Sequence, residues 1–389
     1  MSLSKFCLTA FLAFLTLSFL LPDTSSAIPA FARKYKVSCN TCHSVFPRLK
    51  DYGDEFAGNG FIIKEKETPR DYVTAGDDLL WLNKDYPIAT RIDLFMTHEE
   101  GKDVEDDFKI PWGLKLLSGG TLYKNIGYYF YFYMQEQGEV AGIEDAYIHF
   151  DNIFSTNLDV LVGQFQICDP LMKRELRLTY EDYMIYKTYI GESHMNLAYD
   201  RGIMLAYDVN KTGTTLIGMV VNGNGKPEAE NGSFDQNNNK SIALRINQNI
   251  LDFMTIGGFY YTGKEDSPDS NRTNEVKYYG PDLTFGRGPV ELTAQFLIRE
   301  DSNPLFLSSA QDDKTTGYVV ELVFAPDFNR SRYYVTALYN NIDSDNYKYE
   351  TATLSFTYQI ARNLRIMTEY TRDLEIDKNR FVLGLVSAF

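Results

Sequence analysis

Two cysteines followed at once by a histidine, Cys39, Cys42 and His43, constrain this chain more than any other feature. In a Cys-x-x-Cys-His run, both thiols can form thioether bonds to a haem and the histidine can ligate its iron. A zinc site would need a second ligand pair, but the other cysteines are only Cys7 and Cys168. A thioredoxin-type pair gives the histidine no role and lacks a surrounding βαβ pattern. The run therefore predicts one covalently bound haem c.

An export signal is predicted over residues 1–27. Lys5 precedes an apolar or small run from Phe6 to Leu21, and small residues lead to Ala27. This apolar core is short for a membrane span and matches a cleaved secretory signal. Removal of the signal would discard Cys7. Export agrees with covalent haem attachment, which needs a compartment outside the cytoplasm.

A small haem-binding unit with its linker is predicted over residues 28–86. Phe46, Leu49 and Phe56 recur at three- to four-residue spacing before Gly58 and Gly60. This spacing predicts an amphipathic helix whose apolar stripe covers one haem face. A unit this small has little core of its own and needs a covalent group or a partner domain.

The sixth iron ligand is missing from this unit. Between Ile28 and Tyr86 the sequence has no methionine, and His43 is its only histidine. Met and His are the common axial ligands of c-type haems. Either the sixth position is open or its ligand comes from the rest of the chain, so we expect the unit to dock into a second domain.

The remaining residues, 87–389, alternate between apolar and polar side chains in successive short segments. Arg365, Met367 and Glu369 share one face of such a segment, whereas Leu364 and Ile366 share the other. Counting these segments gives roughly 16 strands, an even number within the range of outer-membrane barrels. The fold is therefore predicted to be mainly β: a 16-stranded antiparallel outer-membrane barrel, with the short helical haem unit plugging its lumen.

Composition favours a membrane barrel over a soluble β-sandwich or propeller. The chain has 28 Tyr and 26 Phe but only 2 Trp, and aromatic girdles are typical of outer-membrane barrels. An alternating segment ends at Phe389, and a terminal aromatic is what barrel-insertion machinery usually recognises. A net charge of −15 argues against nucleic acid and favours cations. We expect the bacterial outer membrane as location and its lipid as a partner.

One long connection lacks clean alternation and is predicted to fold into the lumen. It runs from Cys168 to Lys187 and contains Lys173, Arg174 and Arg177. Basic side chains that line a constriction favour anions. An ordinary solvated loop, with nearby acidic residues balancing these charges, fits the sequence equally well.

The chain resembles the fused outer-membrane monohaem cytochrome–porin family, of the iron-oxidising type. The resemblance covers the whole mature chain. Its specific motifs lie mainly in the first thirty or so mature residues, and over the barrel the match is mostly one of architecture. The matching motifs are Pro29-Ala30-Phe31-Ala32-Arg33, Cys39-x-x-Cys42-His43, Pro47-x-Leu49, Gly53-x-x-Phe56, Gly60-Phe61, Val162-Gly163-Gln164-Phe165 and Tyr279-Gly280-Pro281.

The resemblance implies electron transfer across the outer membrane. It implies that the haem passes electrons between an extracellular metal donor such as Fe(II) and a periplasmic c-type cytochrome, in the manner of an iron:cytochrome oxidoreductase. Cys39 and Cys42 carry over as covalent sites and His43 as axial ligand. Two alternatives stay open: outward electron export to an extracellular acceptor, and a porin for anions or small solutes in which haem is a structural or gating plug.

Strand parity offers distal ligands that the resemblance does not supply. His149 shares a face with Asp145, and Met367 shares a face with Arg365 and Glu369, so both are expected in the lumen. Met204 is expected there as well. Met96 and His98 lie nearer the haem unit in sequence but share a face with apolar residues, so they should meet lipid.

Overall fold

The computed structural model describes residues 30–67, 86–235, 237–267 and 272–389. The predicted signal peptide and most of the linker after residue 67 lie outside these residues. No helix in the described ranges is long and apolar enough to cross a membrane. The helical elements are α2 (Ala30–Tyr35), α3 (Asp51–Gly58) and the 3₁₀ turns η1 (Cys39–Thr41), η2 (Lys64–Lys66), η3 (Ile153–Ser155), η4 (Arg174–Leu176), η5 (Met184–Tyr186) and η6 (Phe328–Arg330).

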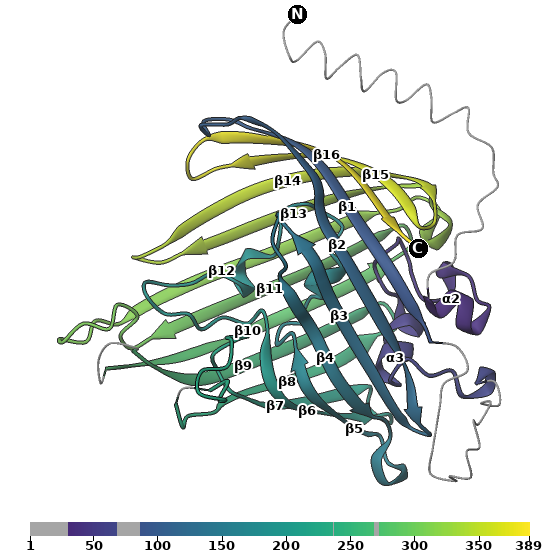
Figure 1. Ribbon diagram of the computed structural model, residues 1–389, viewed down its shortest axis with the longest axis horizontal. Helices are drawn as coiled ribbons and strands as arrows, with labels where there is room; N and C mark the ends of the chain where they lie inside the picture. The colour runs from purple at the N-terminus through teal and green to yellow at the C-terminus, as the bar shows by residue number, and fades with distance from the viewer. Residues whose placement is uncertain (1–29, 68–85, 236, 268–271) are drawn as a thin grey trace, which may run out of the picture.

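Sixteen antiparallel strands form one closed barrel, because β1 pairs with β16 as well as β2 (Figure 1). This confirms the predicted fold class and strand number. The strands are β1 (Ile88–Glu99), β2 (Asp106–Tyr123), β3 (Ile126–Glu136), β4 (Gly142–Phe150), β5 (Leu158–Phe165), β6 (Asp200–Val209), β7 (Thr214–Val221), β8 (Ser241–Leu251), β9 (Met254–Asp266), β10 (Thr273–Arg287), β11 (Val290–Asp301), β12 (Asp313–Phe324), β13 (Tyr333–Asp343), β14 (Lys348–Ala361), β15 (Leu364–Asp373) and β16 (Lys378–Ala388).

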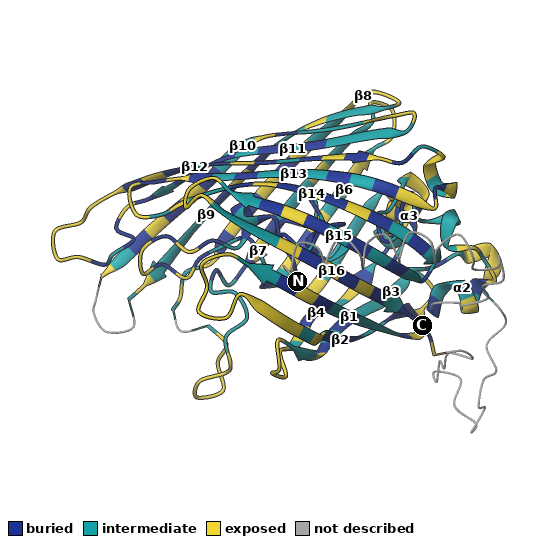
Figure 2. Cartoon of the chain, turned by 90° about the horizontal axis from the view of Figure 1, so that it is seen from above, coloured by how far each residue is buried: buried dark blue, intermediate teal, exposed yellow. Residues whose placement is uncertain are grey.

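Side chains alternate between a buried lumen face and an exposed outer face, as Figure 2 shows by its alternating bands. In β15, Arg365, Met367 and Glu369 are all buried, whereas Tyr370 is exposed. The predicted lumen parity is therefore confirmed in this strand. Met96 is exposed on the outer face, also as predicted. The outer band is apolar because lipid hydrocarbon offers no hydrogen-bond partners, so polar side chains facing it would be unpaired.

The connection between β5 and β6 fills the middle of the barrel. Ile167, Tyr183 and Met195 pack against lumen-facing side chains such as Tyr261 of β9 and Leu338 of β13. This confirms the predicted lumen loop and rules out an ordinary solvated loop.

The lumen loop is also tied to the wall by polar contacts. Glu369 of β15 accepts hydrogen bonds from the backbone nitrogens of Tyr180 and Glu181 at 2.7 and 2.9 Å. Arg299 of β11 donates to the Met195 carbonyl at 2.9 Å. The lumen loop is therefore held at several points of the barrel wall.

Residues 30–67 lie at one end of the barrel, where the turns between strands are short and where the last strand ends (Figures 1 and 2). Val45 packs against Leu178 of the lumen loop and against Val323 and Tyr334 of the wall. At Gly127 of β3, an added Cβ would lie 2.4 Å from the carbonyl oxygen of Gly60. The two backbones therefore approach so closely that only glycine fits.

The predicted helix over the haem unit is shorter than its apolar spacing indicates. Phe46 and Leu49 lie outside α3, which begins at Asp51. His43 and Leu49 form an isolated β-bridge, and the nitrogen of Lys50 donates to the Cys42 carbonyl at 3.0 Å. These backbone groups pair across a turn and so cannot enter a helix ladder.

Candidate functional site

The two cysteines lie on one tight turn. Ser38 caps the 3₁₀ turn η1, since its hydroxyl accepts a hydrogen bond from the nitrogen of Asn40. The nitrogens of Cys42 and His43 both donate to the Cys39 carbonyl, at 3.2 and 2.9 Å. Both thiols are free rather than joined in a disulfide. Burial raises the pKa of each thiol above its usual value, so both are protonated at neutral pH.

The imidazole of His43 is oriented by the chain's own backbone. Its Nδ1 lies 2.7 Å from the carbonyl oxygen of Pro47. A carbonyl can only accept, so Nδ1 is the donor and Nε2 keeps its lone pair. Burial lowers the pKa of His43 to about 4, although the Pro47 carbonyl acts in the opposite direction. His43 is thus a neutral imidazole whose Nε2 is free to bind iron.

Helix α3 packs directly against this turn. A Cβ added at Gly53 would lie 2.1 Å from the carbonyl oxygen of Cys42 and 3.0 Å from Leu49. Any side chain at Gly53 would therefore push α3 away from the cysteines. By contrast, a Cβ added at Gly58 in the same helix meets nothing within 4 Å.

An aromatic cluster lines the other side of the haem unit and continues into the barrel wall. Phe31 stacks on Phe61 with ring centroids 5.1 Å apart, and Phe56 meets Phe31 edge-on at 5.2 Å. Phe61 in turn stacks on Tyr129 of β3 at 4.9 Å. These rings connect the two parts of the molecule through one apolar contact.

The residues present fit a haem c. Two free thiols on one turn and a neutral histidine, whose ring contacts Phe46, supply the groups that covalent attachment and proximal ligation need. In the described part of the chain, no three His, Cys, Asp or Glu side chains form a group that could hold a metal ion by themselves. Cys39, Cys42 and His43 would hold the haem.

Arg48 anchors the haem unit in the barrel wall. Its guanidinium donates to Glu291 of β11 at 2.6 Å and to Thr293 at 2.8 Å, and it also pairs with Glu321 of β12. Burial opposes the charge, but Glu321 and Glu291 outweigh it and raise the pKa of Arg48. Glu321 has no exposed side-chain area and also accepts from Tyr183 of the lumen loop at 2.8 Å.

Further contacts hold the turn after the cysteines. The carbonyl of Phe46 accepts hydrogen bonds from Tyr334 at 3.1 Å and from Arg365 at 3.0 Å. Lys173 of the lumen loop donates to Asp54 of α3 at 2.8 Å. Haem unit, lumen loop and wall therefore form one bonded assembly.

The two predicted distal ligands both lie in the lumen wall. His149 is buried next to Gly60, and its Nε2 is 3.8 Å from a carboxylate oxygen of Asp159. Met367 is buried among Phe95, Val382 and Val386. Both orientations match the parity argument, whereas their role as ligands stays a prediction. Met204 is buried in the lumen cluster too.

Two of the three basic residues that were expected to line a constriction are paired with carboxylates. Arg174 is buried and pairs with Asp182 at 2.8 Å, while Lys173 pairs with Asp54. Arg177 donates to the Arg174 carbonyl at 3.0 Å. Pairing with carboxylates weakens the attraction that Lys173 and Arg174 would exert on an anion.

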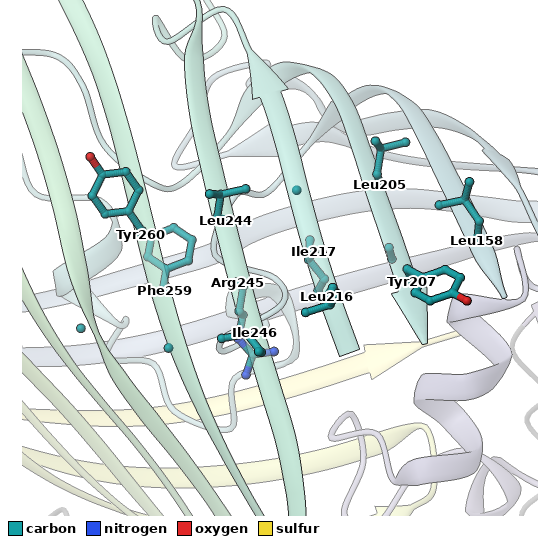
Figure 3. Close-up of a pocket in the computed structure, with 14 residues that line it drawn as sticks. Leu158, Leu205, Tyr207, Leu216, Ile217, Leu244, Arg245, Ile246, Phe259 and Tyr260 are labelled. Carbon is teal, nitrogen blue, oxygen red and sulfur yellow. The ribbon is translucent and has the colours of Figure 1, made fainter. Parts of the chain in front are cut away.

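A shallow depression of about 710 Å³ lies on the outside of the barrel between Leu205, Leu216, Leu244 and Tyr260, where Gly218 leaves a gap (Figure 3). Its apolar side chains belong to the outer band, and neither Cys39, Cys42 nor His43 lines it.

The sequence alone does not single out two residues that position the cysteine turn, Arg48 and Gly53. Nothing in the spacing distinguishes Arg48 from other surface arginines, since its partners Glu291 and Glu321 are more than two hundred residues away in sequence. Gly53 belongs to the Gly53-x-x-Phe56 motif, but the motif does not predict its close packing on the carbonyl of Cys42, which the structure shows.

Comparison with known proteins supports the barrel. No family model and no curated protein matches the sequence. Among solved structures, an anion-selective porin from Comamonas acidovorans aligns with a TM-score of 0.58 at 10% identity, covering 78% of this chain and 99% of the porin. The outer-membrane channel DcaP of Acinetobacter baumannii aligns with a TM-score of 0.54 at 13% identity, covering 78% and 97%. At such identities the likeness concerns the fold: this chain is a porin-like 16-stranded barrel, in agreement with the predicted outer-membrane location.

Proposed function

We propose that this protein transfers electrons across the bacterial outer membrane through one covalent haem held at the mouth of a porin-like barrel. The observation that carries the proposal is the Cys39–Cys42–His43 turn, in which the Pro47 carbonyl leaves the imidazole Nε2 free. A haem bound there supplies a one-electron couple between ferric and ferrous iron.

The placement of the haem unit fits a connection to the periplasm. Outer-membrane barrels have short turns on the periplasmic side and longer loops outside. Residues 30–67 lie at the end with the short turns, within reach of a soluble periplasmic carrier such as a c-type cytochrome. The chain's contacts at Arg48 and Phe46 fix the unit in that position.

The opposite end suits a cationic donor such as Fe(II). Its long loops carry many exposed carboxylates, which raise the local concentration of cations. These residues are Glu100, Asp103, Glu105, Glu139, Glu192, Glu228, Glu230, Asp312, Asp345, Glu375 and Asp377.

Haem attachment is tested first. The full chain is expressed in a bacterial host that matures c-type cytochromes, and the purified protein is analysed by intact mass and by its alkaline pyridine spectrum. We expect the mass of one haem and a two-thioether spectrum, both lost in the Cys39→Ala/Cys42→Ala variant. Haem-free wild-type protein would contradict the proposal.

A second candidate function is a channel for anions or small solutes with haem as a plug or gate. The porin-like fold favours it, and one structural neighbour is named an anion-selective porin. The paired state of Lys173 and Arg174 weighs against an anion pore. Single-channel recording in planar bilayers separates the two: a freely conducting, ion-selective pore indifferent to haem redox state would favour the channel.

A further inference from the structure

Two buried side chains that face each other across β14 and β15 have donor nitrogens without an acceptor. Gln359 of β14 pairs with Arg365 of β15 in the strand register, and the two residues are 4% and 5% exposed. Within the described residues, neither Nε2 of Gln359 nor Nε of Arg365 finds an acceptor. Buried polar atoms are almost always paired, so two orphan donors on opposite positions of neighbouring strands need an explanation.

A second arginine adjoins these donors from the short turn between β14 and β15. The guanidinium of Arg362 donates to Oε1 of Gln359 at 3.0 Å. It also donates to the backbone carbonyls of Ser331 and Arg330, at 3.2 and 3.0 Å. Arg362 is therefore held in place at the end of the barrel where residues 30–67 lie.

Both arginines have only neutral partners. Arg365 donates to the Phe46 carbonyl and to the Tyr334 hydroxyl, each at 3.0 Å. In the part of the chain that the structure describes, the partners of Arg362 and Arg365 are carbonyl and hydroxyl oxygens, and none is a carboxylate. Two positive charges thus lie beside orphan donors without an anion among these partners.

Arg365 reaches this donor group to the haem unit beside the histidine. The carbonyl that Arg365 holds belongs to Phe46, whose ring meets the ring of His43 edge-on with centroids 4.7 Å apart. The candidate axial ligand and Arg365 therefore contact the same residue.

Arg362 adjoins the haem unit beside the cysteines. Asn329, which precedes Arg330 in its turn, donates to the carbonyl of Asn40 at 3.5 Å, and Asn40 lies between the two cysteines. Burial raises the pKa of the Cys39 thiol, and the positive charge of Arg362 acts in the opposite direction. The donor group thus borders both halves of the Cys-x-x-Cys-His turn.

The chemistry of the donor group calls for a carboxylate. Guanidinium groups present parallel N–H donors that match the two oxygens of a carboxylate, and such charge-assisted bonds are the strong ones. A haem carries two propionate carboxylates of its own. A haem joined to Cys39 and Cys42 would bring these anions to the end of the barrel that holds Arg362 and Arg365.

We propose that Arg362, Gln359 and Arg365 bind propionate of the haem attached at Cys39 and Cys42. This inference rests on the haem of the proposed function and adds residues of the barrel wall that hold it. Ferric haem carries one more positive charge than ferrous haem, so nearby guanidinium groups favour the ferrous state.

The first test is the midpoint potential of the haem-loaded full chain in detergent, measured by spectroelectrochemistry. Arg362→Gln should shift the equilibrium about tenfold towards ferric haem, which lowers the midpoint by about 59 mV for one electron. Arg362→Lys keeps the charge and should restore most of the shift. Arg287→Gln removes an exposed arginine at the end of β10, on the same end of the barrel, and should leave the midpoint unchanged.

A second readout reports the hydrogen bond itself. The propionate bending band in the resonance Raman spectrum moves to lower frequency when a donor to the carboxylate is lost. We expect this movement in Arg362→Gln and not in Arg287→Gln. A merely structural role of Arg362 would leave the band in place.

An unchanged midpoint and an unchanged band in Arg362→Gln would overturn the proposal, since the donor group would then hold some other anion. If Arg362→Gln yields no folded barrel, Gln359→Leu replaces it and should move the band in the same direction. Wild-type protein without haem would overturn both this proposal and the proposed function. A haem that shows the expected shifts but is not reduced by Fe(II) would keep the propionate site and count against Fe(II) as donor.

Discussion

At the scale of single residues, the protonation state of His43 decides whether it can bind iron. Its pKa of about 4 is below the usual value of 6.5 because burial disfavours the charged ring. Because the pKa is lowered in the folded protein, the neutral His43 ring contributes to the stability of the fold. This stability contribution is fully present above about pH 6.5 and is lost as the pH falls towards 4.

The haem-loaded protein should therefore keep its axial histidine in mild acid. We expect the visible spectrum of the oxidised protein to stay unchanged between pH 7 and 5, because the imidazole remains neutral there. Spectral loss of the axial ligand between pH 7 and 6, where an ordinary exposed histidine gains its proton, would show that His43 is not held as the structure has it.

Gly53 gives a second prediction at this scale. Gly53→Ala places a methyl group 2.1 Å from the Cys42 carbonyl oxygen, which forces α3 off the cysteine turn. We expect covalent haem content, measured by pyridine spectrum per protein, to fall severalfold. Gly58→Ala is the matched control, since its added Cβ meets no atom within 4 Å. Equal haem content in both variants would contradict the packing argument.

At the scale of elements, the haem unit depends on the barrel through Arg48, which contacts β11 and β12. The haem unit has only two short α-helices and two 3₁₀ turns and little core of its own, so contacts with the wall position it. Truncating one partner of a buried ion pair leaves the other charge unpaired, at a cost of about 3–5 kcal/mol.

Arg48→Ala should therefore undock the haem unit without unfolding the barrel. We expect limited proteolysis to cleave within residues 30–67 much faster than in the wild type, while strands β1–β16 resist. Lys36→Ala, at an exposed position of the same unit, serves as the control and should be cleaved at the wild-type rate. Wild-type resistance in Arg48→Ala would show that the anchor is elsewhere.

Much of the barrel could be predicted from the sequence because strand alternation is a local property. The parity of Arg365, Met367 and Glu369 assigns the lumen face directly, and burial of all three confirms it. The start of α3 could not be predicted, because the apolar spacing of Phe46 and Leu49 continues through a turn in which backbone groups pair with Cys42 and His43.

The candidate site likewise has one part that the sequence predicts and another part that it does not. Cys39, Cys42 and His43 form a local motif, so their chemistry is readable from spacing alone. Arg48 and its partner Glu321 come together only when the barrel closes. Long-range partners of this kind leave no periodic signal in the chain.

At the scale of the whole molecule, the barrel has a loop packed inside its lumen and carries residues 30–67, with the proposed haem site, at one end. The lumen loop is packed against the wall, and the haem unit is bonded to both. The acidic loops at the other end would gather the metal donor.

The most direct measurement is stopped-flow mixing of the oxidised, haem-loaded protein with Fe(II) under anaerobic conditions. The account predicts prompt appearance of the ferrous haem spectrum, followed by reoxidation when an oxidised periplasmic c-type cytochrome is added. A haem that stays ferric with Fe(II), yet is promptly reduced by the reduced periplasmic cytochrome, would contradict inward electron transfer and leave export as the direction of flow.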